Sequence, residues 1–319
     1  MKRNLLIMSF CLLLGAQLSM AQTATGTMFI VNEIKAVMSQ GEQTGQEISI
    51  PEVDADDVRK ALSKWGKGYK AKVSTAKGSQ EVFIDNANIP TVSDNPVDIY
   101  VTVNPGSDGK GAVMKSFIDL GGVFLSSSEH PMAFNAIEKE IIAFAREQLI
   151  NFADDNVKAE EKHLESLESD LKSLQKDKSG YEKDIRNHTD NIADREQEII
   201  QNEADQKMKE QQIVIQQGIV QETRMKRSSM GTVDEATRKL LDNQVKAEEK
   251  NLKTFENQLK SLRSNMSAAV KDIEKSRNTI AQREQDIIKN QEDQKTKEQQ
   301  IELQQKILEM VRQKRAEIR

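Results

Sequence analysis

The segment Val157-Lys-Ala-Glu-Glu-Lys162 opens a stretch of 63 residues that returns, without a gap, from Val245-Lys-Ala-Glu-Glu-Lys250 onward. The two copies are offset by 88 residues and are identical at 35 of the 63 aligned positions. They consist almost wholly of residues that favour helices. A repeat of this length and composition predicts that roughly half of the chain is a duplicated helical rod, and it says little about chemistry.

The distribution of proline supports long helices. All five prolines occur by Pro131, and the 188 residues that follow contain only the glycines Gly180, Gly218 and Gly231. Because proline in a helix interior costs about 3 kcal/mol, its absence over this length predicts uninterrupted helix.

Both copies carry an unbroken seven-residue period, which predicts a left-handed coiled coil. A second seam, three residues later, is apolar early in each copy and polar afterwards. Asn202 and Asn290 on this polar part are expected to set the register and the number of partners. The first seam runs through Val157, Leu164, Leu171, Lys178, Ile185, Ile192, Ile199, Gln206, Ile213 and Val220, with its counterparts 88 residues later.

A turn is predicted at residues 228–232, because Gly231 can end a helix and Thr232-Val-Asp-Glu235 has the form of a capping box. The two copies then pair antiparallel, with residue 171 near 289 and residue 202 near 258. The apolar half of each copy thereby meets the polar half of the other, as duplication of a self-pairing helix would leave it. Each arm would reach on the order of 130 Å.

A compact four-helix bundle is the alternative, with each copy broken at Ser179-Gly180 or at residues 265–267. Both places offer plausible helix caps. The heptad seam nevertheless passes through them without a change of phase, which favours the long hairpin.

The residues before the rod predict an α+β head domain, in which an antiparallel sheet is covered by helices. The expected order is strand, strand, helix and four strands, and then a long helix that begins at Pro131. The expected helix, Asp54–Trp65, is stopped by Gly66 and Gly68. The expected strands are 28–38, 46–50, 70–74, 81–84, 97–103 and 113–117.

The N-terminus predicts export. Residues 1–21 have a basic start, a short apolar run and a small-residue cleavage site, as signal peptides have. Cys11, the chain's one cysteine, lies inside that run, so neither a disulfide nor a lipid anchor is expected in the mature protein. The expected parts are the signal peptide 1–21, the head 22–156, the first arm 157–227, the turn 228–232 and the second arm 233–319.

Charge excludes some classes of partner. Without the signal peptide the chain carries 44 basic and 51 acidic residues, and residues 157–319 carry 32 of each. A rod whose charges cancel has no footprint for nucleic acid and does not resemble a polybasic membrane helix. We expect no nucleic-acid partner and no transmembrane span.

No residue pattern predicts a catalytic, cofactor or metal site. The three histidines, His130, His163 and His188, are not spaced as metal ligands. Trp65, Tyr69 and Tyr100 could line a pocket in the head, although a place in the core is the stronger interpretation. One possible partner contact is the basic cluster Arg224, Lys226 and Arg227 at the expected hairpin tip.

Three features together resemble a group of secreted α+β and coiled-coil proteins of Bacteroidota. They are the end of the signal peptide at Met20-Ala-Gln22, the tract Ser116-Phe-Ile-Asp-Leu-Gly-Gly-Val-Phe-Leu-Ser126 before His130-Pro131, and the acidic-basic rod. The resemblance covers most of the chain. It implies export, and it implies neither an activity nor functional residues.

We therefore expect a non-enzymatic scaffold of the cell envelope, periplasmic or extracellular, that needs no cofactor. The head would dock or self-associate, and the hairpin would act as a rigid spacer or hold a protein partner. The alternative is a periplasmic holdase chaperone with helical tentacles. The balanced charge and an outer face expected to consist of Lys, Glu, Gln and Asn count against that alternative.

Overall fold

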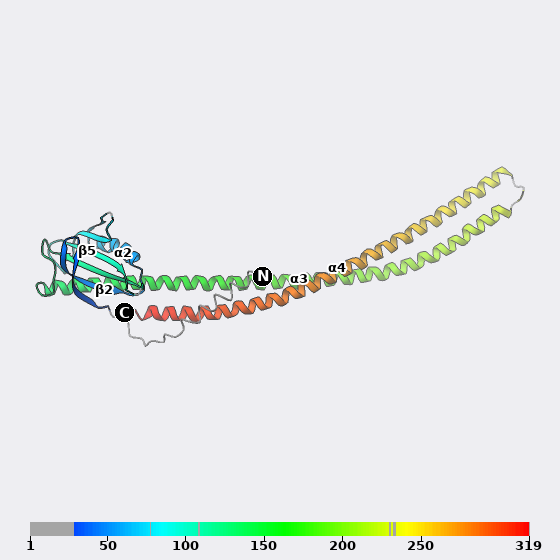
Figure 1. The fold of residues 1–319 in the computed structure, drawn as a ribbon. Coiled ribbons are helices and arrows are strands. Elements are labelled where there is room, and N and C mark those ends of the chain that lie inside the picture. Colours follow the sequence, from blue (N-terminus) through cyan, green and yellow to red (C-terminus); the bar gives the residue numbers. More distant parts are fainter. Residues whose placement is uncertain (1–28, 77, 108, 230, 232–233, 319) are drawn as a thin grey trace. The chain divides into compact units, whose positions relative to one another are not determined.

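A computed structural model describes residues 29–76, 78–107, 109–229, 231 and 234–318 (Figure 1). They form two compact units. The first unit contains the residues up to Glu165 together with those from Glu302 onward, and the second contains Ser166–Ile301. The predicted signal peptide, residues 1–21, lies outside the described residues.

The first unit contains a six-stranded sheet in which every neighbouring pair of strands is antiparallel. The strand order is β1-β2-β6-β5-β4-β3, so the last strand in sequence lies between β2 and β5. The predicted strands are confirmed, with bounds β1 Val31–Met38, β2 Gly41–Ile50, β3 Lys72–Thr75, β4 Glu81–Ala87, β5 Val97–Pro105 and β6 Ala112–Asp119.

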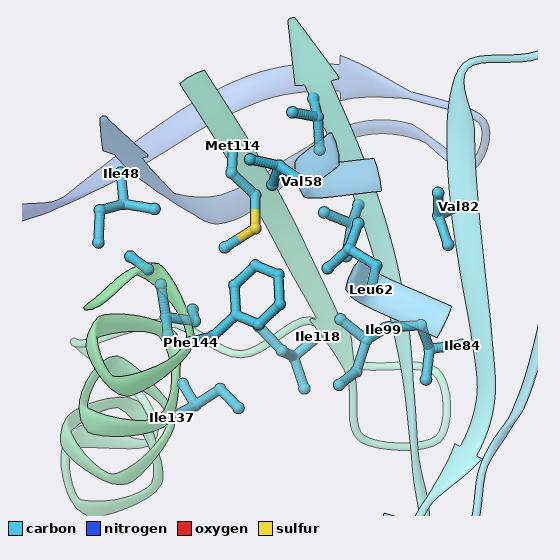
Figure 2. Close-up of a cluster of buried hydrophobic side chains, with 14 of the residues drawn as sticks. Ile48, Val58, Leu62, Val82, Ile84, Ile99, Met114, Ile118, Ile137 and Phe144 are labelled. Atoms are coloured by element: carbon cyan, nitrogen blue, oxygen red, sulfur yellow. The ribbon is translucent and has the colours of Figure 1, made fainter. Parts of the chain in front are cut away.

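Alternation along the strands gives the sheet one strongly apolar face. In β5 the buried residues are Val97, Ile99, Val101 and Val103. Helix α2 (Ala55–Gly68) and the first turns of α3 (Pro131–Ser229) cover this face. Figure 2 shows Leu62 of α2 and Phe144 of α3 converging on the same side of the sheet. The predicted α+β head is confirmed.

Helix α2 begins as predicted and ends later. The Asp54 carboxylate accepts a hydrogen bond of 2.7 Å from the Asp56 amide and caps the helix. Gly66 was expected to stop this helix, but it lies buried inside it. A Cβ at Gly66 would come within 2.6 Å of Val73 and 2.9 Å of Ile84, so glycine is present because the helix lies close to the sheet.

Helices α3 and α4 (Glu235–Ala316) run without interruption through the predicted break points at residues 179–180 and 265–267. Residue pairs from the two helices contact one another in antiparallel order in both units. The coiled-coil hairpin is therefore confirmed over the four-helix bundle. No helix among the described residues is long and apolar enough to cross a membrane.

The predicted register of the hairpin is wrong by about one heptad. Lys297 pairs with Asp170 at 3.2 Å, and the Gln206 amide lies 3.3 Å from the Met266 sulfur. Residue 171 therefore lies near 297 rather than 289, and residue 202 near 266 or slightly beyond. A slip of one heptad leaves the apolar seam matched, so the sequence period does not distinguish the two registers.

The second helix of the hairpin has Asp234 at its start. The predicted cap, Thr232, lies outside the described residues. The Asp234 carboxylate accepts hydrogen bonds of 2.9 Å from both the amide and the hydroxyl of Thr237, at the start of α4. These bonds lower the pKa of Asp234 and fix the beginning of the second helix.

Candidate interaction surfaces

The basic cluster near the hairpin turn consists of side chains that already have carboxylate partners. Arg224 bonds Glu249 of α4 at 2.6 Å, and Lys226 bonds Glu222 of its own helix at 2.8 Å. Arg227 also pairs across the hairpin, with Asp242. Each cation is neutralised locally, so this surface presents ion pairs rather than free positive charge. Its role as a partner contact stays a prediction.

A groove in the first unit lies between α2 and α3, with a volume of about 440 Å³. Its aromatic lining comes from Trp65 of α2, from Tyr69 directly after that helix and from Phe144 of α3. The Trp65 ring centroid lies 5.4 Å from that of each of the other two. Lys64 and Glu147 lie 3.6 Å apart at the rim. The groove therefore combines aromatic surface with one charge of each sign.

The hydroxyl in this groove is held as a hydrogen-bond donor. The Tyr69 hydroxyl donates to the Glu140 carboxylate at 2.6 Å. Burial first, and then this bond, raise the pKa of Tyr69 well above its usual value. A phenol that keeps its proton is a poor nucleophile and a poor general base, so the groove is suited to binding.

Of the three aromatic residues considered for a pocket, only two come together. Tyr100 alternates in β5 with the buried Ile99 and Val101, so it lies on the other face of the sheet from Trp65 and Tyr69. There it stacks on Phe83 with 4.8 Å between ring centroids. Trp65 and Tyr69 lie four residues apart at the end of α2, so they are close in sequence, but their position beside Phe144 depends on tertiary packing.

The outer surface of α3 in the second unit is more apolar than expected. Ile200, Val214 and Ile215 are exposed by 68%, 66% and 64%, and Met208 and Ile219 are also exposed. The expected outer face of Lys, Glu, Gln and Asn is thus wrong for this segment. The run Ile213-Val-Ile215 is the sequence signal for it, because only Ile213 belongs to the heptad seam.

The end of α4 lies against the head, within the first unit. Arg315 bonds the Asp154 carboxylate at 2.5 Å, which lowers the pKa of Asp154, and Lys314 pairs with Glu52. Ile318 packs against the core of the head. These contacts fix the last turns of α4 on the head.

Among the described residues, no group of His, Cys, Asp or Glu side chains could hold a metal ion. His188 lies on the coiled-coil seam, where its Nδ1 is 3.3 Å from the Ser276 hydroxyl. His130 begins the turn that leads into α3, as expected.

The comparisons with known proteins give no family. No family model matches the chain, and no curated protein matches it. Among solved structures, the chain is similar to the Smc head domain with a coiled coil and joint derived from Pyrococcus yayanosii, at 16% sequence identity and a TM-score of 0.28. The match covers 91% of this chain and 70% of that chain. A likeness at this level assigns neither family nor function.

Proposed function

We propose that this protein is an exported, non-enzymatic scaffold of the cell envelope. The head would dock on a partner or self-associate, and the hairpin would serve as a rigid spacer or as a surface that holds a protein partner. The predicted signal peptide and the resemblance to secreted Bacteroidota proteins support export. The proposal requires no cofactor, metal ion or nucleic acid.

The observation that carries the proposal is how the polar groups on the coiled-coil seam are paired. Gln216 of α3 and Gln304 of α4 are buried. The side-chain amide of each donates a hydrogen bond to a glutamate of the opposite helix. Arginines on both helices form ion pairs across the hairpin. Buried polar groups that are satisfied in this way favour one rigid arrangement over a cleft that opens to receive clients.

Site-specific photo-crosslinking in cells tests the proposal. A photoreactive residue would be placed at Ile215 on the exposed aliphatic surface, at Trp65 in the groove and at Lys226 near the turn. Lys260 on the outside of α4 is the control position, because it is exposed and belongs to none of these surfaces. A scaffold should give one discrete crosslinked species from one of the three surfaces and none from Lys260. Uniformly diffuse crosslinks at all positions would contradict the proposal.

The exposed residues Ile200, Val214 and Ile215 also support the second candidate, a holdase chaperone, because they offer apolar surface to an unfolded client. Suppression of aggregation of a denatured outer-membrane protein at equimolar ratio separates the two functions. The scaffold proposal expects no suppression. Strong suppression that is lost in a Val214→Lys/Ile215→Lys variant, and kept in a Lys207→Glu variant of the same helix, would favour the chaperone.

A further inference from the structure

Several polar contacts between α3 and α4 occur in pairs that are related by the 88-residue offset. The Gln216 amide donates to Glu248, at 2.7 Å to its carboxylate and 3.2 Å to its main-chain carbonyl. The Gln304 amide donates to Glu160 in the same two ways, at 2.5 Å and 3.2 Å. Gln304 follows Gln216 by 88 residues, and Glu248 follows Glu160 by the same number. The second contact is therefore the first with the roles of the two helices exchanged.

Three ion pairs across the hairpin repeat under the same exchange. In each case an arginine of α3 and an acid of α4 correspond to an arginine of α4 and an acid of α3. The pairs are Arg224–Glu249 with Arg312–Glu161, Arg227–Asp242 with Arg315–Asp154, and Arg195–Asp272 with Arg283–Asp184.

One contact is its own counterpart. His188 and Ser276 are 88 residues apart, and they face each other across the seam at 3.3 Å. In an antiparallel pair of identical helices every contact occurs twice, and the residue on the two-fold axis meets its own copy. The register of this hairpin is the one that such a symmetric pair would have, with residues 188 and 276 at the position of the two-fold axis.

Helix α3 consequently holds both members of every repeated contact. If a second α3 replaced α4 in the same register, each acceptor would again meet its donor. The central part of the apolar seam would keep the same residues, because Ile185, Ile192 and Ile199 occupy the places of Ile273, Ile280 and Ile287. The donors and acceptors present in α3 are Gln216 and Glu160, Arg224 and Glu161, Arg227 and Asp154, and Arg195 and Asp184.

We propose that the seam face of α3 is a self-recognition surface and that its occupant is α3 of a second copy of this chain. The hairpin is the intramolecular form of this pairing. Joining the two helices in one chain gives the closed hairpin an effective concentration on the order of millimolar. A second copy therefore competes only when the hairpin has opened and the protein is concentrated.

Crosslinking of the full chain tests this inference. In a Cys11→Ser background, which removes the chain's one cysteine, a His188→Cys variant is unfolded in urea and refolded at about 0.5 mM, near the effective concentration of the closed hairpin. A short bismaleimide then joins thiols that face each other. In a closed hairpin the thiol introduced at position 188 has no thiol opposite it, whereas between two α3 helices it meets its own copy.

The matched control is Asn187→Cys, one residue away on the exposed surface of α3. We expect at least roughly tenfold more crosslinked dimer from the seam thiol than from this surface thiol, because only the seam is enclosed by a partner helix. Refolding in dilute solution should abolish the dimer. A His188→Cys/Ser276→Cys variant should form its crosslink within one chain in dilute solution.

Three results would overturn the inference. The first is a dimer yield for His188→Cys that does not exceed that of Asn187→Cys. The second is no crosslink within the His188→Cys/Ser276→Cys chain, because the register would then be wrong. A mixture of His188→Cys and Ser276→Cys chains that crosslinks only with each other shows exchange of unlike arms and also contradicts the inference. These outcomes do not depend on whether the protein is a scaffold.

Discussion

Two glycines inside α3 offer a direct measure of how continuous this helix is. Gly180 and Gly218 lie in the helix interior and are exposed, and an added Cβ would meet no other atom within 4 Å at either position. Neither residue adopts a positive φ. Alanine is therefore free to replace each of them, and in an exposed helix interior it is favoured over glycine by about 0.8–1.0 kcal/mol.

The magnitude for the double variant Gly180→Ala/Gly218→Ala follows by addition, because the two residues share no neighbours. We expect the free energy of unfolding of the hairpin to rise by about 2 kcal/mol. With a denaturant dependence of about 2 kcal/mol/M, the urea midpoint should rise by about 1 M. The assay is urea unfolding followed by circular dichroism at 222 nm, which reports mainly on the long helices.

Gly66→Ala is the matched control, since Gly66 is also a glycine inside a helix. Its added Cβ would lie 2.6 Å from Val73 and 2.9 Å from the fully buried Ile84. Overpacking of this kind costs about 1–3 kcal/mol, which exceeds the gain in helix propensity. We expect Gly66→Ala to destabilise the head, read out by the fluorescence of Trp65, the chain's one tryptophan.

The sign of the effect at Gly180 decides the case. If Gly180→Ala lowered the urea midpoint of the helical transition, Gly180 would occupy a turn that needs glycine, and α3 would be broken there. That outcome would refute the continuous helix and favour the four-helix bundle. If Gly218→Ala raised the urea midpoint in the same assay, the opposite sign at Gly180 would be explained by a break at Gly180 rather than by a general effect of alanine.

Three further predictions concern single contacts. Gly45→Ala should cost more than about 1–3 kcal/mol in urea unfolding of the head, because its Cβ would lie 2.5 Å from the buried Phe117 ring and close to rigid backbone. Asp154→Asn should remove the negative charge that pairs with Arg315. Since the pKa of Asp154 is lowered in the folded protein, the contribution of this charge to stability is present above the ordinary pKa of about 3.9 and is lost as the pH falls through the folded value. Thermal unfolding of the variant and the parent should therefore differ at pH 7 and converge in acid, and a difference that grew below pH 4 would contradict this account. Asp234→Ala should cost about 1 kcal/mol through loss of the α4 cap, while Asp234→Asn should cost less, and equal losses in the two variants would argue against capping.

Much of the fold could be predicted from the residues because its signals are local. Alternating apolar residues in β5 define a half-buried strand wherever that strand pairs, and Pro131 defines a helix start from its fixed φ. The order of the strands within the sheet is a different matter. Insertion of β6 between β2 and β5 depends on contacts between residues far apart in sequence, and no periodicity encodes it.

The candidate surfaces were less predictable for the same reason. The basic residues Arg224, Lys226 and Arg227 are visible in the sequence, but the acids that neutralise Arg224 and Arg227 come from α4 and depend on the register. The groove beside Trp65 exists only because the packing of α2 and α3 on one sheet face places Phe144 next to it.

The sequence by itself determined that this chain has a mixed head, two long helices and an antiparallel hairpin. Helix propensity, the absence of proline after Pro131 and the seven-residue period all act through neighbours a few residues apart. Only the tertiary structure decided the register, since the seven-residue period is the same before and after a slip of seven residues. The register is selected by directional polar contacts such as Gln216 with Glu248 and Gln304 with Glu160. Their hydrogen bonds form only when the donor and the acceptor lie opposite each other across the hairpin.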